Sequence, residues 1–99
     1  MNSQDFPTLT QFFGGYFHQD WVDEFSTPED AIAAFRNAAP AETIQSACRE
    51  LDRLIHLIQQ GAEAPQRVLQ ALGCYYDPSA DALVVMDWLE QVRNRLECK

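Results

Sequence analysis

Residues 41–60 read AETIQSACRELDRLIHLIQQ and carry the strongest helical pattern in the chain. Their apolar side chains recur every three or four residues, at Ile44, Ala47, Cys48, Leu51, Leu54, Ile55 and Ile58. This spacing places them along one face of an α-helix, which needs a core to pack against. Pro40 precedes the segment and Gly61 follows it, as is typical of the two ends of a helix. The segment therefore predicts a long amphipathic helix.

Two helical patterns precede this segment. Residues 9–17 place leucine and aromatic side chains at helical spacing, although Gly14–Gly15 weakens this helix in its middle and can break it. Residues 27–30, TPED, then supply an N-cap hydroxyl, a proline for the first turn, and acids for the positive end of the helix dipole. A second helix is expected to begin there and to end near Ala39, because the residue before a proline avoids helical geometry.

Two more helical patterns follow the long segment. Residues 65–72 place apolar side chains on one side and end at Gly73, and residues 74–78, CYYDP, predict a turn. The last helix is expected from about Asp81 to Cys98, with Ser79 as its cap. No segment shows the sustained alternation of a strand. The sequence thus predicts an all-α fold, a single small bundle of four to five helices.

The composition is that of a small acidic protein. A chain of 99 residues can bury one compact core, so a single domain is expected over residues 1–99. Seven Lys and Arg stand against fifteen Asp and Glu, which gives a formal net charge of −8. Such a surface repels phosphate groups, so nucleic acid and anionic membrane are not expected as partners, and a basic protein is favoured.

The cysteine pattern and the lengths of the apolar stretches indicate the cellular compartment of the protein. Cys48, Cys74 and Cys98 make an odd count at wide spacing without a C-x-x-C pair, a pattern that fits neither a disulfide framework nor a zinc site. Reduced thiols are therefore expected. The sequence has neither a signal-peptide pattern at its start nor an apolar stretch of the roughly 20 residues that span a bilayer. A cytoplasmic location is expected.

The negative charge is concentrated in the first third of the chain. Six acids occur before the first basic side chain, Arg36: Asp5, Asp20, Asp23, Glu24, Glu29 and Asp30. Two interpretations remain open. The acids form either a solvated face that keeps a small protein soluble, or a docking surface for a basic partner.

The sequence contains no recognisable catalytic or cofactor-binding motif. His18 and His56 are the two side chains suited to proton transfer near neutral pH, but no nucleophile motif accompanies them. Gly14–Gly15 lacks the lysine of a phosphate-binding loop. The sequence therefore predicts no enzyme, no metal and no cofactor. Two alternatives stay open: a small metal-binding or enzymatic protein that uses His18, Asp20 and Asp23, and a generic helical adaptor that holds a peptide in an apolar groove.

Residues 11–21, QFFGGYFHQDW, resemble a family of immunity proteins from contact-dependent growth inhibition systems, and GGYFHQDW is the most specific part of the match. The resemblance continues at TPED, at Leu51–Asp52 and at residues 73–78, GCYYDP, so it covers nearly the whole chain. Members of that family are small cytoplasmic helical proteins that bind the C-terminal toxin domain of a cognate effector and so protect the producing cell. Because such toxins are often nucleases with basic clefts, an acidic inhibitor is the electrostatic complement.

The resemblance implies a protein partner, so two sets of residues are assigned. The shared aromatic motif is interpreted as scaffold: His18 is expected to bond a backbone carbonyl or a carboxylate such as Asp20, and the tyrosine rings are expected to be buried. The structural set is Tyr16, Phe17, His18, Trp21, Tyr75 and Tyr76. The candidate toxin-binding residues are Asp20, Asp23, Glu24, Glu29 and Asp30, with Asp77 and Asp81 as a second patch. The chain is expected to be a monomer or a weak dimer.

Overall fold

The computed structural model describes residues 3–61 and 64–98, and within these ranges it contains six α-helices, two 3₁₀ helices and no strand. In chain order the elements are η1 (Ser3–Asp5), α1 (Pro7–Tyr16), α2 (Trp21–Glu24), α3 (Pro28–Ala38), α4 (Ala41–Gln59), α5 (Pro65–Ala71), η2 (Pro78–Asp81) and α6 (Val85–Arg95). The predicted all-α bundle is confirmed. The helices outnumber the expected four to five because α2 is a single turn without a readable period.

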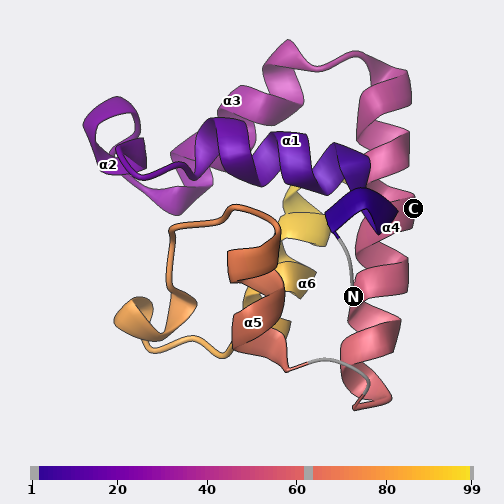
Figure 1. Cartoon of the computed structure of the whole chain (residues 1–99). Coiled ribbons are helices and arrows are strands. Elements are labelled where there is room, and N and C mark those ends of the chain that lie inside the picture. Colours follow the sequence, from indigo (N-terminus) through magenta and orange to yellow (C-terminus); the bar gives the residue numbers. More distant parts are fainter. Residues whose placement is uncertain (1–2, 62–63, 99) are drawn as a thin grey trace.

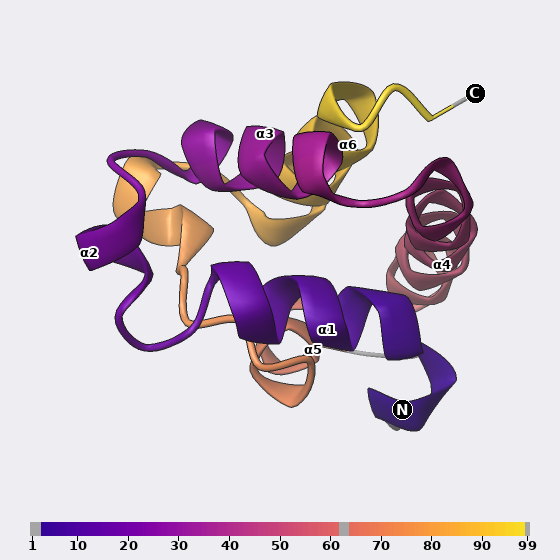
Figure 2. The same cartoon turned by 90° about the horizontal axis from the view of Figure 1, so that it is seen from above.

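The long amphipathic helix α4 stands at one end of the molecule (Figure 1). From α4, both α1 and α3 extend toward the opposite end, where α2 lies, and the view from above shows the same arrangement (Figure 2). The small helix η2 lies at that opposite end too, below α2 in Figure 1. Segments that are far apart in sequence, around residues 20–30 and 75–81, therefore share one end of the fold.

Helix α1 runs unbroken through its two glycines. A Cβ added at Gly14 or Gly15 would meet no neighbouring atom within 4 Å, so neither glycine is required there by crowding. The glycine that the backbone conformation favours is instead Gly73, which faces Gly14 from the turn after α5. Gly73 has a φ of +81°, and a Cβ on it would lie 3.6 Å from the Cα of Gly14. The turn after α5 thus passes close to the backbone of α1 with a left-handed conformation that favours glycine.

A buried carboxylate joins α1 to α4. Helix α1 has no side-chain cap from its own N-cap residue, Phe6. Instead Glu50 of α4, which is only 7% exposed, accepts hydrogen bonds from the backbone N–H of Thr8 at 3.2 Å and of Leu9 at 3.0 Å. These N–H groups have no partner within the helix, and a negative charge is favoured at this end of its dipole. Glu50 therefore acts as a cap supplied from another helix.

The centre of the molecule is aromatic. Phe12 of α1 stacks on Phe35 of α3 with ring centroids 4.1 Å apart. Trp88 of α6 contacts Phe17 edge-on at 5.4 Å and Tyr76 at 5.0 Å. Ring pairs of this kind add to the stabilisation that burial alone gives. They connect α1, α3, α6 and the turn after α5 in a single core.

The C-terminal helix is shorter than expected. It begins at Val85 rather than Asp81, because residues 78–81 form η2 and Ala82 takes a left-handed conformation with a φ of +61°. The expected capping of this helix by Ser79 is also wrong. The N–H and the hydroxyl of Ser79 both donate to Asp77 Oδ1, at 3.0 and 2.7 Å, so that Asp77 caps the start of η2.

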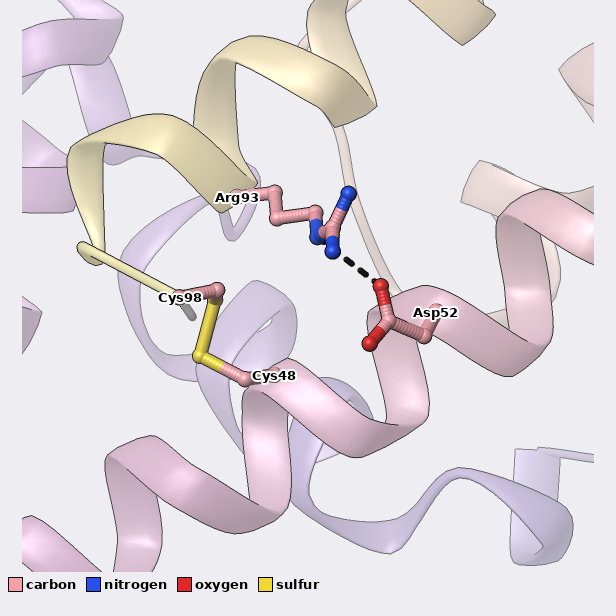
Figure 3. The surroundings of a disulfide bond; sticks show 4 residues. All are labelled: Cys48, Asp52, Arg93 and Cys98. Carbon is pink, nitrogen blue, oxygen red and sulfur yellow. Dashed lines mark ion pairs between the residues drawn. A yellow bond between two sulfur atoms is a disulfide. The ribbon is translucent and has the colours of Figure 1, made fainter.

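A disulfide ties the segment that follows α6 to the middle of α4 (Figure 3). Cys48 and Cys98 are bonded, with Cα atoms 5.6 Å apart, so the expectation of three reduced thiols is wrong for two of them. Cys74 remains free and is buried. Beside the disulfide, Arg93 Nε lies 2.8 Å from Asp52 Oδ1, and this ion pair links α6 itself to α4. The bonded cysteines are 50 residues apart, and only the packing of α6 on α4 makes them neighbours.

Candidate partner-binding surface

The first acidic candidates lie around α2 and the start of α3. Asp20 occupies the N-cap position of α2, and Asp23 and Glu24 lie within that helix. Glu29 and Asp30 lie in the first turn of α3, where negative charge favours the helix. All five side chains are exposed. They occupy one short stretch of surface and point to solvent rather than into the core.

His18 holds this stretch in shape. Its Nδ1 accepts a hydrogen bond from the backbone N–H of Asp20 at 3.1 Å. Its Nε2 lies 3.2 Å from Glu24 Oε1. With Nδ1 as an acceptor, a neutral ring carries its hydrogen on Nε2 and donates it to Glu24. The carboxylate bonded to His18 is therefore that of Glu24, whereas Asp20 contributes its backbone.

The second acidic pair lies at η2, and each carboxylate has a local role. The pKa of Asp77 is lowered because its carboxylate accepts hydrogen bonds from the hydroxyl and the N–H of Ser79. Asp81 Oδ2 accepts a 2.6 Å hydrogen bond from the hydroxyl of Tyr76. Burial raises the pKa of Tyr76, and this hydrogen bond and the charges of Asp81 and Glu29 raise it further. Both carboxylates remain exposed.

The fold brings the two acidic patches together. The rings of Trp21 and Tyr76 meet edge to face at 5.5 Å, and the backbone N–H of Tyr75 donates to the carbonyl of Phe17 at 2.7 Å. We call the joined surface the acidic end. Its members are Asp20, Asp23, Glu24, Glu29, Asp30, Asp77 and Asp81. No Lys or Arg occurs in residues 1–35 or 68–92, which supply all seven acids, so no cation from these segments neutralises it.

The aromatic residues of the shared motif are placed unequally. Phe17 and Tyr76 are buried, and Tyr16 and Trp21 are half-buried against the core. Tyr75 differs: its side chain is 65% exposed, so the expected burial of this ring is wrong. Side chains of neighbouring residues in an extended segment point to opposite sides. Here Tyr76 points into the core and Tyr75 points to solvent.

A groove of about 590 Å³ lies beside Tyr75, between the end of α5 and η2. Its lining includes Leu69, Pro78 and Val85, which are buried, and Asp77 at its edge. No pattern in the sequence predicts this groove. It depends on the way that the CYYDP turn is folded back over α5.

Within residues 3–61 and 64–98, no group of three or more His, Cys, Asp or Glu side chains is arranged to hold a metal ion. In the same ranges no helix has the length and apolar character to cross a membrane.

Comparison with known proteins assigns the family. No curated protein matches the chain significantly. Among solved structures, one chain of a CdiA-CT/CdiI complex from Y. kristensenii is similar, with a TM-score of 0.80 and 22% sequence identity over 93% of this chain and 98% of that one. At that identity the likeness concerns the fold. The family model of the CdiI immunity protein matches residues 5–96. The chain therefore belongs to the CdiI immunity protein family.

Proposed function

We propose that this protein binds the C-terminal toxin domain of a cognate contact-dependent growth inhibition effector and neutralises it by binding alone, without catalysis. The observation that carries the proposal, beside the family, is the acidic end: seven exposed carboxylates from two distant segments that contain no Lys or Arg. The similar solved structure is itself a CdiA-CT/CdiI complex. A rigid, uniformly anionic surface attracts a basic partner and accelerates its association.

The toxin that fits this surface best is a nuclease acting in the cytoplasm. An enzyme that binds nucleic-acid phosphates needs a basic cleft, and carboxylates presented by a folded protein compete for the same cleft. A cytoplasmic site of action is a reducing environment, and we expect the protein to stay folded there even without the Cys48–Cys98 disulfide. The core and the Arg93–Asp52 and Arg36–Glu97 ion pairs remain to hold α6 in place.

The test is co-expression of this chain with the toxin domain encoded beside it. We expect cell survival and co-purification of a complex, and we expect both to be lost on reversal of two acids, Asp20→Lys with Asp23→Lys. A matched control reverses Glu42 and Glu90, which are exposed acids on α4 and α6, and so changes the net charge equally. Equal loss in both variants would show that net charge, and not the acidic end, matters.

The nuclease assignment has its own measurement. The purified toxin domain should degrade RNA or DNA, and one equivalent of this chain should abolish the cleavage. If the chain protects cells from a toxin domain that has no nuclease activity, the nuclease assignment is wrong and the proposal that the chain is an inhibitor stands. Absence of both rescue and complex would refute the inhibitor itself.

A further inference from the structure

Tyr75 stands apart from the other aromatic residues. The chain has six Phe, three Tyr and two Trp. All the others contact another ring, or in the case of Phe6 the guanidinium of Arg53, whereas Tyr75 has no such partner among the described residues. An exposed, unpaired tyrosine beside a groove is typical of a binding anchor, since its ring offers contact area with few rotatable bonds.

The backbone presents this ring in a fixed place. The N–H of Cys74 donates to the carbonyl of Leu69 at 2.9 Å, and the N–H of Tyr75 donates to Phe17 at 2.7 Å. The next side chain, Tyr76, is buried and bonded to Asp81. A partner therefore meets Tyr75 on a segment that is already ordered, which reduces the entropy lost on binding.

The groove beside Tyr75 combines apolar walls with an anionic edge. Leu69, Pro78 and Val85 give it an apolar lining, and Asp77 lies at its edge. Both hydrogen bonds of Ser79 go to Oδ1 of Asp77, and no bond to Oδ2 is found among the described residues, so Oδ2 can accept from a partner. No Lys or Arg is among the described residues that line the groove. This set fits a side chain with an apolar stem and a cationic, planar head.

We propose that the groove between α5 and η2 receives an arginine side chain of the toxin domain, with its guanidinium over the Tyr75 ring and paired with Asp77. The inference rests on the proposed function and names where the partner is anchored. Arginine fits better than lysine because its planar head stacks on an aromatic face while bonding a carboxylate. Its methylene stem lies along the apolar wall.

The experiment measures the Kd of this chain for the co-encoded toxin domain by titration calorimetry. Tyr75→Ala and Asp77→Asn should each raise the Kd by about tenfold or more, the size typical of an anchor residue. Tyr75→Phe keeps the ring face and should bind like the wild type. Asn keeps an oxygen for Ser79, so the turn is preserved. The Kd of the double variant should rise by less than the product of the two single fold-changes, because both groups contact the same arginine side chain.

The outcomes separate this inference from the proposed function. If Tyr75→Ala and Asp77→Asn bind with unchanged Kd while the wild type still protects cells, the groove is not the anchor and the inhibitor stands. A loss in Tyr75→Phe as large as in Tyr75→Ala would overturn stacking on the ring. If the wild type neither binds nor protects, the proposed function fails first. Circular dichroism of each variant verifies that the fold is retained.

Discussion

At the scale of single residues, buried polar groups determine how the helices are fixed. Glu50 is the charged side chain that the described core encloses, and both of its oxygens accept from the first turn of α1. In sequence it belongs to the polar side of an amphipathic helix and gives no sign of this role. Loss of the carboxylate leaves two N–H groups without an acceptor in a site that water reaches poorly.

We therefore expect Glu50→Ala to lower the free energy of unfolding by about 1 to 3 kcal/mol. Glu50→Gln, which retains one oxygen, should cost less. Urea denaturation followed by circular dichroism measures both. Glu42→Ala, an exposed acid on the same helix, serves as the control and should change stability little. An equal effect of Glu50→Ala and Glu42→Ala would contradict the cap.

Tyr76 gives a pH dependence with a definite sign. Its pKa is raised in the folded protein, so the unfolded chain ionises first, near its ordinary pKa of 10.0. Stability is complete below that pH and is lost as the pH rises above it. The wild type should lose more stability than Tyr76→Phe between pH 9 and about 11, as measured by urea denaturation. Parallel curves for the two proteins would argue against a buried hydroxyl bonded to Asp81.

At the scale of elements, α4 and α6 are joined by more than apolar contact. The Arg93–Asp52 pair lies in the last turns of α6, and the buried Leu96 and the disulfide at Cys98 follow directly after the helix (Figure 3). A disulfide closing a loop of 50 residues restricts the unfolded chain more than the folded one. Its contribution should therefore appear in stability rather than in shape.

Cys48→Ser with Cys98→Ser should lower the free energy of unfolding by about 2 to 4 kcal/mol relative to the oxidised protein. Reductant should destabilise the wild type to the same extent and leave the variant unchanged, which thermal melts with and without dithiothreitol measure. The variant should still protect cells on co-expression, because the core is untouched. Loss of protection would show that the disulfide shapes the binding surface.

At the scale of the whole molecule, the acidic surface and the links that fix α4 to its neighbours lie at opposite ends. Helix α4, with the Glu50 cap and the disulfide, stands at one end, and the acidic end, with α2 and η2, lies at the other (Figures 1 and 2). The two charged segments remain adjacent because Trp21 packs on Tyr76 and Tyr75 bonds the backbone of Phe17. A one-sided charge distribution orients an approaching basic protein.

The association rate with the toxin domain should therefore fall as salt rises, since screening shortens the reach of the field to about 10 Å at 0.1 M. Asp20→Lys with Asp23→Lys should slow association and flatten this salt dependence, whereas reversal of Glu42 and Glu90 should change it less. Stopped-flow mixing at several salt concentrations provides the rates. A rate that is independent of salt in the wild type would remove the case for electrostatic steering.

The sequence determined the helices with the clearest local signals. The apolar period of residues 41–60 predicted α4 almost to the residue, and Thr27, whose hydroxyl accepts from the N–H of Asp30, marked the start of α3. Composition and the GGYFHQDW motif indicated an acidic member of an immunity family, and the family match agrees. Helix period, capping and net charge are properties of short segments or of the whole composition, so they can be read without a fold.

Only the tertiary structure decided which distant groups meet. The start of α6, the Cys48–Cys98 disulfide, the Glu50 cap and the outward position of Tyr75 each depend on packing between segments far apart in the chain. The union of the two acidic patches depends on it as well. Local sequence sets the conformation of a segment, whereas burial and pairing depend on which other segment covers it, and that choice is made by the free energy of the whole core.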